Sequence, residues 1–174
     1  PKTFPLFGDG AGAVLLGANK NSGLLSYTLG AEGEGGPLLG IKAGGSRYPL
    51  DVEAIAKGEQ YIHMDGRSVF KWAVRVLSDS IRDVLIHAKL DIDDIDVVVF
   101  HQANIRIIDA AAETIGIQRE RMVVNLDRFG NTSAASIPIC LSEAVRDGRI
   151  QPGNRVLMCG FGAGLAWGTA ILQW

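Results

Sequence analysis

The sequence predicts an α/β fold in which helices cover a mainly central β-sheet. Apolar, β-branched runs alternate with amphipathic helical segments, and glycine clusters separate them. The resulting order is strand–helix–strand–helix–strand, followed by a hairpin-like pair of strands. The length of 174 residues is sufficient for one domain with a substantial core.

The first third of the chain is rich in glycine. We expect the opening segment, Thr3 to Leu16, to form two strands around a turn at GDGAGA (Gly8 to Ala13). A further strand is expected from Leu24 to Leu29. Residues 30–60 are weakly periodic, which indicates a long surface loop on the substrate side.

A long amphipathic helix is predicted from Ser68 to Ala88, because apolar residues recur there at spacings of three and four. Asp65 or Ser68 is expected to cap its start. The acidic turn, Asp91 to Asp96 (DIDDID), follows; it lacks the glycine and distal glutamate of a calcium loop. Val97 to Phe100 is a β-branched run typical of a buried strand.

The remainder of the chain continues the alternation of helices and strands. Pro138 should kink the last helix or lie near its first turns. The predicted elements are a helix from about Asn104 to Ile115 ended by Gly116, a strand from Met122 to Asn125, a helix from about Ser133 to Arg146, and strands from Arg155 to Cys159 and from Ala166 to Leu172 around the turn GFGAGL.

Composition excludes several classes of protein. Lys and Arg total 17 against 19 Asp and Glu, so a nucleic-acid binder is not expected. No apolar run approaches the roughly 18–20 residues that span a bilayer, and the start lacks a signal-peptide pattern. Two cysteines without a CxxC motif indicate a reducing, cytoplasmic location. The three histidines are widely spaced and show no metal-site pattern.

Two glycine motifs match each other. GDGAGA at Gly8 and GFGAGL at Gly160 share the pattern Gly-x-Gly-Ala-Gly, and their separation suggests a duplication. On this interpretation, residues 1–20 are the closing strands of an otherwise missing first half, and residues 21–174 form the second half. The alternative is a chance repeat in a Gly-rich protein. Neither motif is a dinucleotide fingerprint, because both lead into apolar runs typical of strands.

Two polar residues follow predicted strands. His101 comes directly after a buried strand, where ligands bind in parallel α/β sheets, but for a lone histidine a ring satisfied by a backbone partner is the preferred interpretation. Asn131 lies in RFGNTSAAS, before a helix, and Gly130 would allow the backbone to approach a ligand closely. Taken alone, Asn131 is also compatible with a helix N-cap.

Together the motifs are far more specific. HQAN (His101 to Asn104), the later GNTSAAS, the C-terminal Gly-Phe-Gly-Ala-Gly and the opening FGDGAGAV resemble the β-ketoacyl-acyl carrier protein synthase III family of thiolase-fold condensing enzymes. The resemblance covers essentially the whole chain. It implies the C-terminal half of a duplicated αβαβα sandwich with a mixed five-stranded sheet, in a homodimeric enzyme.

The resemblance also implies an activity: an acyltransferase that condenses an acyl-CoA with malonyl-acyl carrier protein in a decarboxylative Claisen condensation, which initiates fatty acid synthesis. His101 and Asn131 match two members of a Cys-His-Asn site, and the family's cysteine belongs to the missing half. Coenzyme A thioester is then a substrate, with no tightly bound cofactor. We therefore expect this chain alone to be inactive. Its expected partners are acyl carrier protein and the missing half, not a membrane.

Binding residues follow from the same resemblance. Arg67, Lys71 and Arg75 recur every four residues along one helix face, which is also compatible with a solvated charged face. The residues that match coenzyme A contacts are Asn104, Phe70, Ala73 and Arg67, and those assigned to carrier-protein docking are Arg106, Lys71 and Arg75.

The two cysteines of this chain are not expected to act as the nucleophile. Cys140 lies in a helix among apolar residues, and Cys159 ends a strand without the helix N-terminus that would lower its pKa. Two other functions remain open. One is a non-catalytic thiolase-like half-domain; the other is a related CoA-dependent enzyme of the hydroxymethylglutaryl-CoA synthase or polyketide synthase type. HQAN and GNTSAAS favour the ketoacyl synthase over these relatives.

Overall fold

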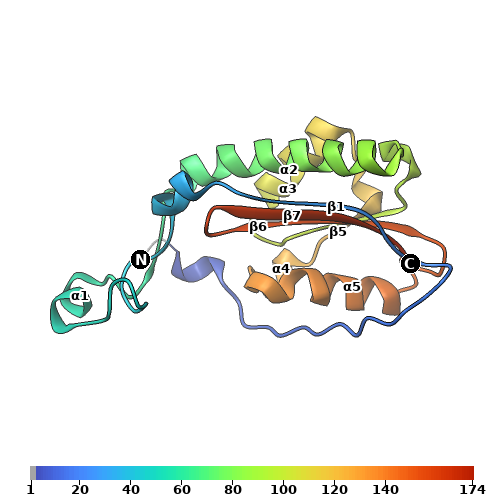
Figure 1. Cartoon of the computed structure of the whole chain (residues 1–174). Coiled ribbons are helices and arrows are strands. Elements are labelled where there is room, and N and C mark those ends of the chain that lie inside the picture. Colours follow the sequence, from blue (N-terminus) through green and yellow to red (C-terminus); the bar gives the residue numbers. More distant parts are fainter. Residues whose placement is uncertain (1–2) are drawn as a thin grey trace.

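A mixed five-stranded sheet forms the centre of the protein (Figure 1). The structure is a computed structural model that describes residues 3–174. The strand order is β1-β7-β6-β4-β5; β4 runs parallel to β5 and β6, whereas β7 is antiparallel to both β6 and β1. The strands are β1 (Gly23–Ala31), β4 (Val97–Phe100), β5 (Met122–Val123), β6 (Arg155–Gly162) and β7 (Ala166–Gln173).

Helices cover both faces of this sheet. α2 (Gly66–Ala88) and α3 (Ile105–Ile115) lie on one face, and α4 (Leu126–Phe129) and α5 (Ser136–Arg146) lie on the other (Figure 1). One apolar cluster fills the space beneath α2 and α3, and a second fills the space beneath α5. Because both faces are covered, all four side chains of β4 are buried, as the sequence predicted.

The long helices begin and end close to the predicted residues. The Asp65 carboxylate accepts a hydrogen bond from the Ser68 backbone N–H (3.2 Å) and caps α2. Asn104 caps α3, which ends at Gly116 in the left-handed conformation (φ 83°). No helix in residues 3–174 combines the length and the apolar character that a membrane crossing requires.

Shorter elements differ from the prediction. α5 begins at Ser136 instead of Ser133, after a 3-10 turn over Ser133–Ala135. Pro138 therefore lies in the first turn of α5, where its missing N–H has no partner to lose. α4, a single turn, was not predicted, and β5 has two residues where four were expected. One turn of helix leaves too few residues for a periodic pattern.

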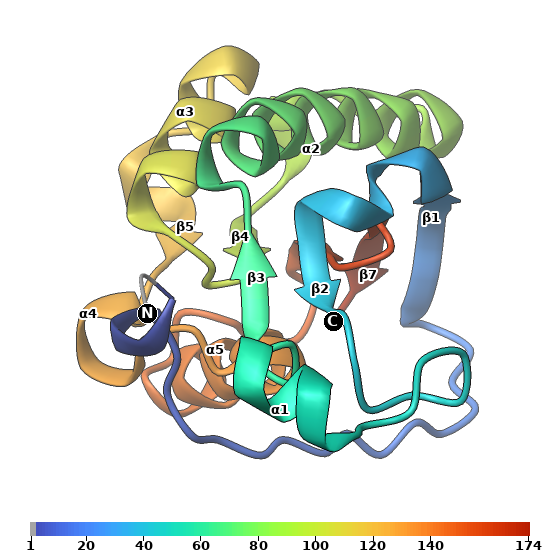
Figure 2. The ribbon, with the colours of Figure 1, turned by 90° about the vertical axis from the view of Figure 1, so that its left-hand side faces the viewer.

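Residues 30–60 are not one long loop, so this prediction was wrong. β2 (Leu39–Ile41) pairs with β3 (Ile62–Met64) in a separate antiparallel sheet, and α1 (Val52–Lys57) lies in the connection between them. Figure 2 shows this unit beside one end of the main sheet. Strands of three residues are too short to give an alternating sequence pattern.

The opening segment also differs from the prediction. Phe4–Leu6 forms a short 3-10 helix, and residues 8–19 belong to no helix or strand but run as a stretched segment along the α5 side of the molecule (Figure 1). GDGAGA is thus part of this stretched segment and not a turn. The side chain of Leu15 is 99% exposed. Within residues 3–174 no neighbouring strand accepts this segment as a ladder partner, so its strand-like composition does not produce a strand.

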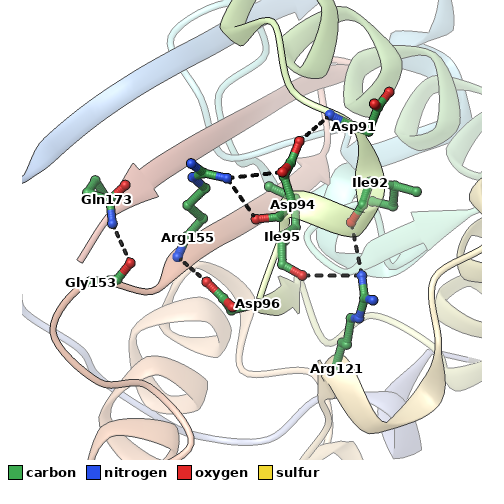
Figure 3. Close-up of polar contacts among 9 residues, drawn as sticks. All are labelled: Asp91, Ile92, Asp94, Ile95, Asp96, Arg121, Gly153, Arg155 and Gln173. Carbon is green, nitrogen blue, oxygen red and sulfur yellow. Dashed lines mark hydrogen bonds and ion pairs between the residues drawn. The ribbon is translucent and has the colours of Figure 1, made fainter.

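The acidic turn joins β4 to its neighbours through arginines (Figure 3). The Asp96 carboxylate accepts a hydrogen bond from the backbone N–H of Arg155 (2.7 Å), whose guanidinium pairs with Asp94 (3.3 Å). Arg121 donates to the carbonyl of Ile92 (3.0 Å). These contacts fix the entry into β4 and β6, and the segment is a polar turn as predicted.

Candidate active site

Both predicted catalytic residues line one cavity of about 700 Å³. It lies at the carboxyl end of β4, between α2, α3, the start of α5 and the β2–β3 pair. Its size and mostly apolar lining are those of a small-molecule site. Its polar and aromatic lining residues include His101, Asn104, Asn131, Ser136, Phe70 and Phe161.

His101 is held in the wall of the cavity by three contacts. Its backbone N–H donates to the carbonyl of Cys159 (2.8 Å), which continues the β4–β6 pairing by one residue. Nδ1 lies 2.6 Å from the Ser136 hydroxyl oxygen, and the ring meets Phe161 edge to face at 5.5 Å. Burial lowers the pKa of His101 to about 4, so the ring is neutral at pH 7 and offers one N–H donor.

Asn131 is fixed by backbone contacts on both sides. Its N–H donates to the Leu6 carbonyl (2.9 Å), and its carbonyl accepts from the Gly8 N–H (3.0 Å). Its side-chain oxygen accepts from the Ser133 N–H (2.9 Å). Because this bond orients the amide oxygen toward the Ser133 N–H, the NH₂ group is the donor end that is free to interact with a ligand. Gly130 takes a positive φ of 67°, which suits glycine and turns the chain into this position.

The loop before Asn131 is anchored to the helix and strand beside it. Arg128 binds Glu143 of α5 through both terminal nitrogens (2.7 and 2.8 Å), which lowers the pKa of that carboxyl. Glu143 also accepts from the Asn125 side chain (2.8 Å). The backbone N–H of Asn125 donates to the fully buried Gln102 side chain (3.1 Å). The segment carrying Asn131 is therefore tied to the segment carrying His101.

Of the four residues predicted to contact coenzyme A, two line the cavity and two do not. Phe70 and Asn104 line the cavity, and Asn104 also caps α3 by accepting from the Arg106 N–H (2.9 Å). Ala73, by contrast, is 0% exposed within the core beneath α2 and does not line the cavity, so the structure offers it no ligand contact. Arg67 is exposed one turn before Phe70 and is not part of the cavity wall.

The predicted carrier-protein residues lie on the surface. Lys71 and Arg75 are exposed on α2, and Arg106 is exposed in the first turn of α3. Arg75 forms an ion pair with Glu32 (3.2 Å), which also accepts from the indole N–H of Trp72 (3.0 Å). Arg75 is thus already engaged within the chain.

Neither cysteine has the properties of a nucleophile. Cys140 and Cys159 are both 0% exposed, and neither lines the cavity. Burial raises the pKa of Cys140 to about 12 and that of Cys159 to about 11, so both remain thiols at pH 7. No cluster of metal-binding side chains occurs within residues 3–174.

Three site residues escaped sequence reasoning. Gln102 and Ser136 lie inside the quoted motifs HQAN and GNTSAAS, but their side-chain partners are distant in sequence. Phe161 lies inside Gly-Phe-Gly-Ala-Gly, a motif that was interpreted through its glycines alone. All three residues belong to motifs that the sequence showed, but their contacts could be recognised only from the folded structure.

Comparison with known families identifies the chain. Residues 85–174, more than half of it, match the model described as 3-oxoacyl-[acyl-carrier-protein (ACP)] synthase III C terminal, and residues 1–33 match the model described as 3-oxoacyl-[acyl-carrier-protein (ACP)] synthase III. The chain belongs to the 3-oxoacyl-[acyl-carrier-protein] synthase III family. Its position in that family agrees with a C-terminal part.

Members of the synthase III family are also its relatives in sequence and in structure. The beta-ketoacyl-[acyl-carrier-protein] synthases III of Rhodopirellula baltica and Symbiobacterium thermophilum are 50% and 51% identical over 99% of the chain, which spans 56% and 53% of their lengths. The solved synthase III of Thermus thermophilus is 44% identical with a TM-score of 0.80, over 90% of this chain and 47% of that one. The predicted thiolase-like fold is confirmed, and the chain spans about half the length of these relatives.

Proposed function

We propose that this chain is the C-terminal half of a 3-oxoacyl-acyl carrier protein synthase III. The complete enzyme would condense an acyl-CoA with malonyl-acyl carrier protein, with His101 and Asn131 as two members of a Cys-His-Asn site. One observation carries the proposal: both residues line the same apolar cavity, and each has one side-chain atom held by the protein. Family membership and the names of the relatives support the same reaction.

The residues suit the chemistry of decarboxylation. When a cysteine-bound acyl group is attacked by a decarboxylating malonyl thioester, negative charge develops on the thioester oxygen. His101 and Asn131 supply neutral N–H donors toward that charge. A donor of this kind contributes roughly 3–4 kcal/mol to the transition state. The apolar lining lowers the local dielectric constant and so strengthens these hydrogen bonds.

The proposal includes a first half that contributes the cysteine. Residues 1–20 would be its closing segment, and the family match of residues 1–33, separate from that of residues 85–174, supports this division. Exposed apolar side chains on this segment and on β1 support a partner surface there. The most exposed of them are Phe4 (83%), Val14 (64%), Leu15 (99%), Leu16 (85%), Tyr27 (60%) and Leu29 (76%).

Binding roles complete the proposal. Phe70 and Asn104 would contact coenzyme A, because both line the cavity. The exposed cations Arg106 on α3 and Lys71 and Arg75 on α2 would dock the acidic carrier protein, and Arg67, also exposed on α2, would contact coenzyme A. We further propose a cytoplasmic, homodimeric enzyme without a tightly bound cofactor.

The test uses the longer protein that the proposal requires. His101→Ala and Asn131→Ala should each reduce malonyl-carrier-protein decarboxylation by roughly 100- to 1,000-fold. The matched controls His87→Ala and Asn21→Ala change exposed residues outside the cavity and should leave it unchanged. A source gene that encodes only these 174 residues, or variants with full activity, would contradict the proposal. The 174-residue chain alone should form no acyl-enzyme with acetyl-CoA, and acylation at either cysteine would also contradict it.

A further inference from the structure

The Ser136 hydroxyl has very few hydrogen-bond partners. Ser136 is 2% exposed and is the first residue of α5. Within residues 3–174, its side-chain oxygen takes part in two hydrogen bonds: with Nδ1 of His101 at 2.6 Å and with the backbone N–H of Gln102 at 3.3 Å. A serine hydroxyl has one proton to donate and two lone pairs that accept.

The backbone N–H of Gln102 can only donate, so it occupies one lone pair of the Ser136 oxygen. The Ser136 proton then has one acceptor in reach, Nδ1 of His101. If Nδ1 itself carried a proton, the hydroxyl proton would be buried without an acceptor, which costs about as much as a lost hydrogen bond. The arrangement that satisfies all three groups places the ring proton of His101 on Nε2.

We propose that Ser136 is a positioning residue that sets the tautomer of His101, so that Nε2 carries the proton. With Nδ1 occupied by Ser136, Nε2 is the ring nitrogen left for the cavity that His101 lines. The opposite tautomer would present a lone pair toward a developing negative charge. This inference rests on the proposed role of His101 as a hydrogen-bond donor. It adds that the Ser136 hydroxyl determines which ring nitrogen is the donor.

Buried hydrogen bonds of Gln102 hold in place the backbone N–H that Ser136 accepts from. Its side chain is fully buried and donates to the Phe100 carbonyl (2.8 Å) while accepting from the Asn125 N–H (3.1 Å). These bonds fix the peptide between His101 and Gln102 relative to β4 and to the loop before Asn131. The backbone N–H of Gln102 therefore has a fixed direction, toward the Ser136 oxygen.

The test reads the tautomer directly, without turnover. The chain contains three histidines, so ¹⁵N-histidine labelling gives few signals, and His101→Gln assigns those of His101. At pH 7, in the wild-type chain, we expect a protonated Nε2 and an unprotonated Nδ1. In Ser136→Ala the ratio of Nε2–H to Nδ1–H should fall at least roughly fivefold, the factor that one hydrogen bond provides.

Two further variants separate tautomer control from general disturbance. Ser136→Thr keeps a hydroxyl and should retain the wild-type ratio, and Ser142→Ala, at an exposed serine of the same helix, should leave all signals unchanged. A wild-type ring protonated on Nδ1, or an unchanged ratio in Ser136→Ala, overturns the inference. If the ratios behave as expected while His101→Ala leaves decarboxylation intact, the proposed function fails and the tautomer assignment stands.

Discussion

Acid should destabilise this protein through His101. Burial lowers the pKa of His101 to about 4 in the folded chain, whereas an exposed histidine titrates near 6.5. The unfolded chain therefore binds the proton more tightly, and the free energy of unfolding falls as the pH drops from about 6.5 towards 4. Between pH 7 and pH 5 the loss spans about 1.5 pH units, or about 2 kcal/mol at 1.36 kcal/mol per unit.

The measurement is urea unfolding at pH 7 and pH 5, on the wild type and on His101→Gln. The wild type should lose about 2 kcal/mol more than the variant over this interval. His87→Gln, at an exposed position, is the matched control and should follow the wild type. Carboxylates with lowered pKa values, such as that of Glu143, change stability only at lower pH and are common to all three proteins. Equal pH dependence in wild type and His101→Gln would refute the assignment of a buried neutral ring.

Three further perturbations test the packing around the site. A Cβ on Gly8 would lie 1.9 Å from the last carbonyl oxygen of α4. Gly8→Ala should therefore break the two backbone hydrogen bonds to Asn131 and lower the free energy of unfolding by about 2 kcal/mol, whereas Gly17→Ala, in open space, should lower it little. Equal melting temperatures of the two variants would contradict this. Gln102→Leu leaves buried backbone groups unpaired and should cost at least about 2 kcal/mol in urea unfolding. Native Cys140 and Cys159 should resist iodoacetamide and react after denaturation; rapid native labelling by mass spectrometry would show that they are accessible.

The sequence predicted the parts of the fold that have long periodic patterns. α2 and α3 show apolar spacings of three and four; Asp65 marks the start of α2, and Gly116 marks the end of α3. β4 was found because helices cover it on both faces, which makes its sequence continuously apolar. β2, β3 and α4 are formed by three or four residues each, and tertiary contacts stabilise them, so no local pattern could reveal them.

The candidate site was predicted unevenly for a related reason. His101 and Asn131 follow from motifs in which several residue types recur in a fixed order, and the structure places both on one cavity. Ser136 contacts His101 across 35 positions in sequence, and such a pairing is visible only once β4 and α5 are adjacent. Ala73 shows the converse. The sequence match placed Ala73 at a binding position, but its burial depends on which face of α2 packs against the sheet, and no local sequence pattern fixes that.

The glycines of the motif at Gly8 allow close packing and do not form the expected turn. Gly8, Gly10 and Gly12 alternate along the stretched segment, and a Cβ on each would lie within 3 Å of the α4–α5 side of the molecule: the last carbonyl of α4, Ile139 or Pro138. Successive residues of an extended chain point to opposite faces, so a period-two run of glycine leaves one face without side chains. This face lets the backbone lie directly against α5 and reach Asn131. The alternation therefore encodes close contact with the loop that carries Asn131, and the turn suggested by glycine content alone does not form.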